Sequence, residues 1–172
     1  MNDVSKLRNY STGCTKGAKP NVTQKLENLY VRSKENPDRW IDRNLYKILA
    51  DVEILELAYK KLRSNPGQMT PGITPETLDG LSRETLENIV GKLKDESFRF
   101  SPGRRVEIPK PSGGSRSLTV APPRDKLVQE AIRMILEPVF EPTFSEHSHG
   151  FRTKRSCHTA LKAVRTQFQT AN

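Results

Sequence analysis

A glycine-rich turn between two short alternating runs is the feature that most restricts what this chain can fold into. Polar and apolar residues alternate from Arg105 to Pro109 and again from Arg116 to Val120, as they do in strands that have one covered face. Between the two runs, Ser112-Gly113-Gly114 supplies the positive φ angles that a tight turn requires. The pattern predicts an antiparallel β-hairpin.

The remaining periodic segments have helical spacing. Apolar residues recur at intervals of three and four in five regions. The first three predicted helices run from Thr23 to about Lys34, from Leu45 to Leu62, and from Ser82 to about Asp95. The fourth begins at Pro122 and is broken by Pro138 and Pro142, and the fifth follows a cap at Ser156. In the last of these we expect Ala160, Leu161, Val164 and Phe168 to face the core. The predicted class is α+β, mostly helical with a small antiparallel β-hairpin sheet, in one domain over residues 22–172 that follows a flexible N-terminal arm at 1–21.

The charge of the chain favours a polyanionic partner. Twenty-nine Lys and Arg against twenty Asp and Glu give a net charge of +9. The excess is concentrated between Arg99 and Lys126 and again after Glu146, outside any strongly amphipathic basic helix, which favours nucleic acid over a membrane surface. A basic surface that is simply solvated remains the alternative. No apolar run approaches the ~20 residues that cross a bilayer, so we expect no membrane partner.

The cysteines and histidines do not suggest a metal site. Cys14 and Cys157 lie far apart in the sequence and form no Cys-x-x-Cys motif, so no disulfide framework is expected. Cys157, His158, His147 and His149 lack the spacing of zinc-finger ligands. We therefore predict no bound metal.

Two basic segments carry the candidate binding residues. Lys110 and Arg116 flank the hairpin tip, where both head groups can reach one triphosphate. Arg104 and Arg105 alternate along the incoming strand, so one should reach backbone phosphates while the other faces away.

The second segment contains Gly150, Phe151, Arg152 and Arg155, with no acid among them. The glycine would let the backbone approach a sugar-phosphate, and the arginines would bind phosphate. Phe151 would either stack on a base or anchor the loop in the core, and both interpretations remain open. Similarly, the Gly- and Pro-rich stretch from Met69 to Ile73 is either an ordered loop beside a ligand or a simple connector.

Five motifs in a fixed order resemble those of one family. From about Leu45 onward the chain is similar to the N-terminal part of a group II intron-encoded reverse transcriptase, also called a maturase. The motifs that carry the resemblance are Gly67-Gln-Met-Thr-Pro-Gly72, Phe100-Ser-Pro-Gly-Arg-Arg-Val-Glu-Ile-Pro-Lys110, Asp125-Lys-Leu-Val-Gln-Glu-Ala-Ile-Arg133, Leu136-Glu-Pro-Val-Phe-Glu-Pro-Thr-Phe144 and Ser148-His-Gly-Phe-Arg-Thr-Lys-Arg-Ser-Cys-His-Thr-Ala-Leu161.

The resemblance implies a fold and roles for matching residues. It implies the fingers and the start of the palm of a polymerase. Lys110 and Arg116 match cations that hold the incoming dNTP, Met69, Thr70 and Gly72 match a loop that covers the template, and Gly150, Phe151, Arg152 and Arg155 match a loop beside the template strand. Two departures stand out: Ser117 replaces a common proline, and Thr153-Lys154 replace the usual Pro-Gly.

The resemblance also implies a limit on activity. In this family the metal-binding aspartates lie downstream of the matched motifs, and two-metal nucleotidyl transfer needs such carboxylates. We therefore expect a chain truncated before them, which is inactive alone as an RNA-directed DNA polymerase and has no cofactor of its own. Mg²⁺ is expected only with the missing palm residues.

The expected function is binding of intron RNA and template in the splicing and mobility of a group II intron. The expected partner is RNA and, if the protein is split, a second chain that carries the rest of the palm. The alternative is a stand-alone RNA-binding splicing cofactor with no polymerase role. The absence of a transit peptide, together with the resemblance, favours a protein encoded and made in a mitochondrion; the alternative location is a bacterial cytoplasm. A fingers fragment without its palm is also expected to expose the apolar face of its last helix.

Overall fold

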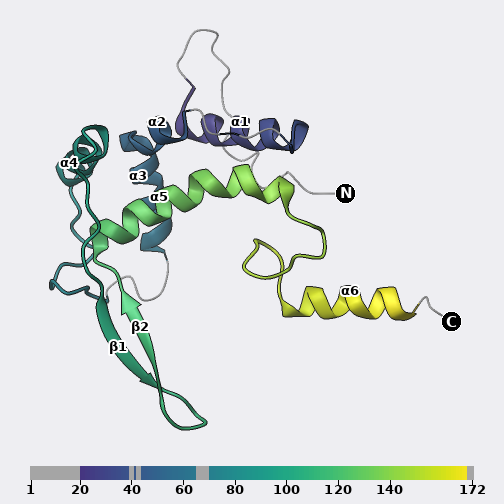
Figure 1. Ribbon diagram of the computed structural model, residues 1–172. Coiled ribbons are helices and arrows are strands. Elements are labelled where there is room, and N and C mark those ends of the chain that lie inside the picture. The colour runs from purple at the N-terminus through teal and green to yellow at the C-terminus, as the bar shows by residue number, and fades with distance from the viewer. Residues whose placement is uncertain (1–19, 39–40, 42–43, 65–69, 170–172) are drawn as a thin grey trace.

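The computed structural model describes residues 20–38, 41, 44–64 and 70–169. Within them the chain forms a mostly helical α+β structure, which confirms the predicted class (Figure 1). Its elements are α1 (Val22–Glu35), α2 (Leu45–Leu49), α3 (Val52–Arg63), α4 (Arg83–Lys94), β1 (Arg104–Pro109), β2 (Ser115–Val120), α5 (Pro123–Phe140), the 3₁₀ turn η3 (Glu141–Thr143) and α6 (Cys157–Gln169). Nearly all of the predicted N-terminal arm lies outside the described residues.

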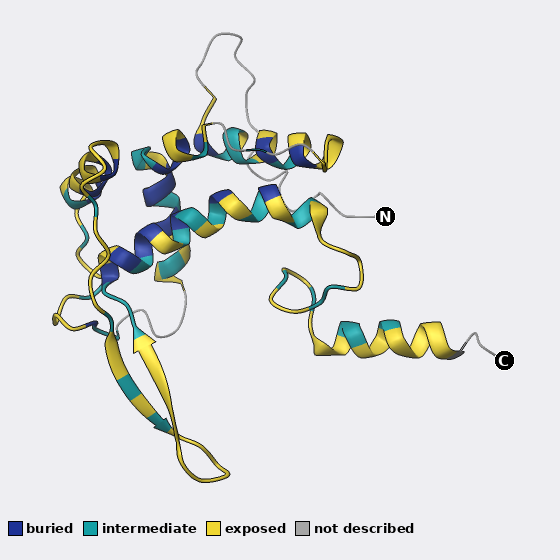
Figure 2. Ribbon diagram, in the orientation of Figure 1, coloured by how far each residue is buried: buried dark blue, intermediate teal, exposed yellow. Residues whose placement is uncertain are grey.

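Helix α5 is the centre of the core. It contacts α1, α2 and α3, while α4 packs on α3. The side chains that these helices bury are almost all aliphatic, and they form one continuous cluster (Figure 2). Its members include Leu29 of α1, Ile54, Leu55 and Ala58 of α3, Leu86, Ile89, Val90 and Leu93 of α4, and Leu127, Val128, Ala131 and Ile135 of α5. No helix among the described residues is long and apolar enough to span a membrane.

The single helix predicted from Leu45 to Leu62 is wrong, because the chain breaks it into α2 and α3. At the break, Asp51 has an extended backbone and its side chain accepts a hydrogen bond from the N–H of Glu53 at 3.2 Å, as an N-cap does. The same carboxylate pairs with Lys25 of α1 at 2.8 Å. Asp51 therefore starts a new helix inside an apolar pattern that continues across it.

The predicted break at Pro138 is also wrong. Helix α5 continues through Pro138 to Phe140, and the proline lies in its last turn. At that position the missing N–H removes one helical hydrogen bond, and Val139 beside it is buried in the core. Burial on the neighbouring positions outweighs the lost bond, and only the 3₁₀ turn at Pro142 ends the helix.

Helix α6 does not face the core, so the inward orientation predicted for it is wrong. Leu161, Val164 and Phe168 are 66%, 51% and 75% exposed, and Ala160 is only half-buried. The helix projects away from α5 (Figures 1 and 2), as expected for a last helix with an uncovered apolar face. Periodicity identifies the apolar face of a helix, but it does not identify what covers that face.

The predicted hairpin is confirmed. Strands β1 and β2 pair antiparallel from Arg104 opposite Val120 to Pro109 opposite Ser115. At the tip, the N–H of Lys110 donates to the carbonyl of Gly114 at 3.0 Å, and Gly113 and Gly114 have φ angles of +88° and +77°. Only glycine adopts two such angles in succession at little cost. The hairpin projects from the start of α5, away from the core (Figure 1).

Candidate nucleic-acid interface

The two faces of the hairpin differ in charge. Side chains alternate along a strand, and directly paired residues share a face. The register therefore gathers cations and apolar side chains on one surface, which we call the hairpin face: Arg104, Val106 and Ile108 of β1, Arg116 and Leu118 of β2, and Lys110, which continues the alternation at the tip.

The cations of the hairpin face differ from those of the opposite face in their partners. Among the described residues, Arg104, Lys110 and Arg116 have no ion pair or side-chain hydrogen bond, and all three are exposed. On the opposite face, the Nε of Arg105 donates to Glu107 at 3.0 Å, and the hydroxyl of Ser115 donates to the other oxygen of Glu107 at 2.9 Å. The predicted alternation of the two arginines is present, and only Arg104 is left without a carboxylate partner.

The first turn of α5 fixes the base of the hairpin and the loop that precedes α4. The carboxylate of Asp125 is 3% exposed and accepts a hydrogen bond from the N–H of Ser101 at 2.8 Å. The ammonium of the next residue, Lys126, donates to the carbonyl of Thr70 at 3.1 Å. Two segments distant in sequence are thus attached to consecutive residues of α5, and the pattern around Pro122-Pro123 does not predict either contact.

Gly72 lies against the same part of the structure. It is buried, and a Cβ atom added to it would lie 2.9 Å from the Cα of Pro122, closer than side chains tolerate. This close contact requires a glycine. The predicted loop residues Thr70 and Gly72 therefore lie beside the start of α5, whereas Met69 lies outside the described residues.

Positive charge accumulates where the hairpin meets α5. Burial lowers the pKa of Lys126 below its usual value, and the nearby Arg104 guanidinium lowers that pKa further. Both effects disfavour the charged ammonium. A bound anion would offset the effect of Arg104 on the pKa of Lys126, because it would screen the repulsion between the two cations.

The second basic segment, residues 148–155, is called the arginine loop below. Its central residue, Arg152, has a side chain only 9% exposed. The guanidinium donates to Glu141 Oε1 from Nε at 3.1 Å and from Nη2 at 2.8 Å, and its Nη1 donates to the carbonyls of Ser145 at 2.8 Å and Ser148 at 3.0 Å. It also lies 5.2 Å from the ring centroid of Phe144. Arg152 therefore holds the loop in shape.

The other residues of the arginine loop differ in exposure. Arg155 is half-buried and donates to the carbonyl of Glu146. Phe151 is fully exposed, so the interpretation of Phe151 as a core anchor is wrong, while stacking on a base stays a prediction. Gly150 has no atom near the position of an added Cβ, so the space beside it is open.

In the arginine loop, Thr153 and Lys154, which replace the usual Pro-Gly, each show a structural feature that bears on the replacement. The hydroxyl of Thr153 donates to Glu137 of α5 at 2.9 Å, a bond that proline could not make. Lys154, at the position where the family usually has glycine, has a φ of +61°. The backbone keeps the left-handed conformation that suits glycine, at a cost of about 1 kcal/mol or more for lysine.

The hairpin and the arginine loop do not form one site. They lie at opposite ends of α5, whose 18 residues correspond to about 27 Å of helix (Figure 1). A ligand that contacted both would have to be an extended polymer. Among the described residues, no three His, Cys, Asp or Glu side chains lie together as a metal site would require, so the described carboxylates do not fit a pair of Mg²⁺ ions.

Comparison with known proteins identifies relatives over most of the chain. No protein-family model matches it. The chain is 52% identical over 167 residues to an uncharacterized 91 kDa protein in a cob intron of Schizosaccharomyces pombe, covering 96% of this chain and 20% of that protein. It is 44% identical over 144 residues to the group II intron-encoded protein LtrA of Lactococcus lactis, covering 83% of this chain and 24% of LtrA.

A more distant relative is nuclear intron maturase 2, mitochondrial, of Arabidopsis thaliana, at 28% identity over 81% of this chain and 20% of that protein. The chain thus spans only about a fifth to a quarter of the length of these relatives. The similarity to them extends across the hairpin, α5 and most of the helical core rather than over a single motif. On this evidence, the chain belongs to the group II intron-encoded proteins.

Proposed function

We propose that this chain is the fingers and the start of the palm of a group II intron reverse transcriptase, and that it binds intron RNA and template. The observation that carries the proposal is the hairpin face, where three unpaired cations share a surface with apolar side chains while Arg105 is paired on the other side. Phosphate contacts dominate affinity for RNA, and they require cations that are not already paired with carboxylates.

Within the hairpin face we assign different ligands to its two ends. Arg116 and Lys110, nearest the tip, hold the triphosphate of an incoming dNTP. Arg104 at the base binds template phosphate, next to the loop of Thr70 and Gly72 that Lys126 holds in place. A guanidinium can form paired hydrogen bonds to phosphate oxygens, which suits both roles.

We assign the arginine loop to the template strand further along. Phe151 stacks on a base, the open space beside Gly150 admits the sugar-phosphate, and Arg155 contributes charge. The contacts of Arg152 support an indirect role, since its donors are occupied by Glu141 and by backbone carbonyls.

Metal-dependent chemistry depends on carboxylates from outside the described residues. In this proposal the chain binds and orients RNA and nucleotide, and a palm supplied by a second chain or a further segment holds Mg²⁺. The site of action is a mitochondrion, which is supported by the similarity to a mitochondrial intron maturase of Arabidopsis thaliana, while the relative from Lactococcus lactis supports the bacterial alternative.

The test is RNA binding across a salt series for matched hairpin variants. Arg104→Ala and Arg116→Ala should each reduce the slope of log affinity against log salt by about one. Arg105→Ala, which removes the same charge from the paired position, should change the slope much less. Equal losses from Arg104→Ala and Arg105→Ala would contradict a role for one face.

Two further measurements distinguish the proposed function from the alternative of a stand-alone splicing cofactor. A group II intron RNA should bind more tightly than an unrelated RNA of the same length if intron recognition is retained. Adding a palm segment in trans should restore DNA synthesis if the chain is part of a polymerase. Selective RNA binding without restored synthesis would favour the alternative, a stand-alone splicing cofactor.

A further inference from the structure

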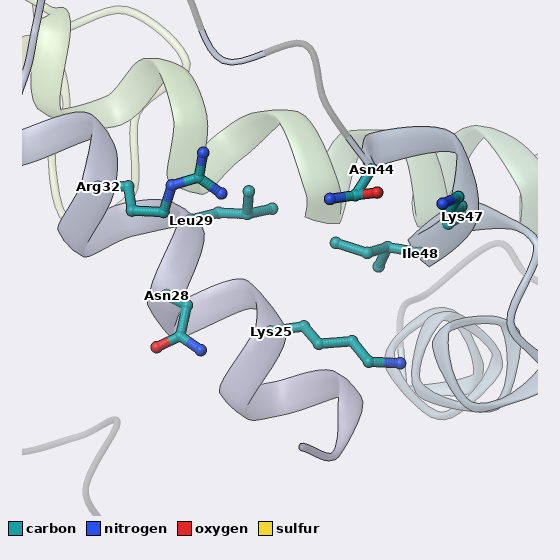
Figure 3. Close-up of a pocket in the computed structure, with 7 residues that line it drawn as sticks. All are labelled: Lys25, Asn28, Leu29, Arg32, Asn44, Lys47 and Ile48. Atoms are coloured by element: carbon teal, nitrogen blue, oxygen red, sulfur yellow. The ribbon is translucent and has the colours of Figure 1, made fainter. Parts of the chain in front are cut away.

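A groove between α1 and α2 forms a second basic surface, separate from the hairpin (Figure 3). Its volume is about 270 Å³. Leu29 and Ile48 point toward one another across the groove and form an apolar floor, being only 4% and 7% exposed. The groove lies on the side of α5 that α1 and α2 cover (Figure 1). The hairpin projects from the start of α5 instead.

The rim of the groove is positive and incompletely neutralised. Lys25, Arg32 and Lys47 line it, together with the amides of Asn28 and Asn44. Lys25 is paired with Asp51 at 2.8 Å. Among the described residues, Arg32 and Lys47 have no carboxylate partner, and both are exposed.

The polar groups of the groove are also available for binding. Asn44 stands at the start of α2 in a left-handed backbone conformation, yet its side chain makes no capping hydrogen bond. In Figure 3 its amide points into the space between the two helices. Asn28 likewise has no side-chain hydrogen bond within the described part of the chain. Amides of this kind can donate and accept at once, as the edges of nucleobases require.

We propose that this groove binds one nucleotide of a single-stranded RNA segment, with the phosphates on its two sides on Arg32 and on Lys47, which lie at opposite ends of the groove (Figure 3), and the ribose over Leu29 and Ile48. The inference rests on the proposed function, since it takes RNA as the ligand of the chain. Two unpaired cations favour a phosphodiester, and the apolar floor with amides beside it suits the attached nucleoside better than it suits a bare anion. An RNA that occupied both the groove and the hairpin face would wrap around the helical core.

The first experiment measures the rate of lysine acetylation by mass spectrometry, with and without a 20-nucleotide single-stranded RNA. Lys47 reports on the groove, Lys110 on the hairpin, and Lys34, which is exposed on α1 outside the groove, is the matched control. At about nine-tenths occupancy, acetylation of Lys47 should slow about tenfold, while Lys34 should change little.

The outcomes separate this inference from the proposed function. Protection of Lys110 with equal rates at Lys47 and Lys34 would overturn the groove and leave the hairpin proposal standing. Protection of Lys47 without Lys110 would support the groove and count against the hairpin. Inorganic triphosphate in a parallel arm should not protect Lys47; protection equal to that by RNA would overturn the assignment in favour of a site for free phosphate.

A second experiment removes the charges. Arg32→Ala with Lys47→Ala should lower the salt slope of RNA binding by about two, or about one for each cation. Lys34→Ala with Lys60→Ala removes the same charge from exposed positions outside the groove, and it should lower the slope much less. Because all four side chains are exposed, both double variants should remain folded, and equal slopes in the two would overturn the inference.

Discussion

The hairpin and the arginine loop have similar basic sequences and use their arginines in opposite ways. On the hairpin face, Arg104 and Arg116 contact no carboxylate among the described residues. In the arginine loop, Arg152 is occupied by Glu141 and by two carbonyls, and Arg155 by a third. A count of basic residues would rank the two segments as similar binding surfaces, whereas the structure shows that they differ in how many of their arginines are already engaged.

The difference follows from how each segment satisfies its backbone. The hairpin forms a ladder between its strands and is attached at its base by Asp125, so its arginines are not needed for support. Within the described part of the chain, the segment from Ser145 to Ser148 pairs with no strand, and the carbonyls of Ser145 and Ser148 accept hydrogen bonds from Arg152. An arginine has five N–H donors, so this one side chain can hold several carbonyls of an irregular segment at once.

The largest expected effect comes from Arg152→Ala. The change removes four hydrogen bonds and leaves the carboxylate of Glu141 without its partner, which should cost about 3 kcal/mol of local stability. Chymotrypsin should then cleave at Phe144 or Phe151 about a hundredfold faster. Arg165→Ala, an exposed arginine on α6, is the control, and equal cleavage rates in the two variants would show that Arg152 does not hold the loop.

A smaller effect is expected from Asp125→Ala. The Ser101 N–H loses a charged acceptor and the first turn of α5 loses a favourable negative charge, which together should lower the free energy of unfolding by about 1–3 kcal/mol. Urea denaturation measures this change. Asp79→Ala removes an exposed carboxylate that makes no hydrogen bond among the described residues, so its midpoint should stay near that of the wild type. Equal urea midpoints for Asp125→Ala and Asp79→Ala would mean that the hydrogen bond between Asp125 and Ser101 does not stabilise the hairpin.

The smallest effect is expected from Glu107→Gln. An exposed ion pair contributes at most about 1 kcal/mol, so stability should change little. If the ion pair with Glu107 keeps Arg105 from binding phosphate, breaking that pair should raise the salt slope of RNA binding by up to about one. Glu84→Gln on α4 provides a control for the lost negative charge alone. The comparison between paired and unpaired arginines fails if the two variants bind RNA identically.

Local signals in the sequence predicted much of the fold. The two glycines of the hairpin tip, the cap at Ser82 and the inward stripe of α4 are each decided within a few residues, and the structure confirms them. The break at Asp51 was missed because the apolar pattern runs through it, and its pairing with Lys25 depends on a residue 26 positions away. At Pro138 the error was the opposite: a break was predicted where the helix continues, since packing outweighs the loss of one helical hydrogen bond.

The candidate site was predictable in its residues but not in their availability. Alternation along β1 predicts that Arg104 and Arg105 face opposite ways and that Glu107 shares the face of Arg105, but it does not predict that these two side chains form an ion pair. Nothing near Arg152 in the sequence indicates that Glu141 will neutralise it. The groove between α1 and α2 joins two helices through tertiary packing, so neither helix shows it alone.

The close approach of Gly72 to Pro122 has a consequence for how this family can vary. The loop and the start of α5 leave no room for a Cβ at position 72, because the obstacle is backbone rather than a movable side chain. A substitution there is tolerated only if the chain at Pro122 moves as well. Across related sequences, the two positions should therefore change together or remain fixed together, although 49 residues lie between them in the sequence.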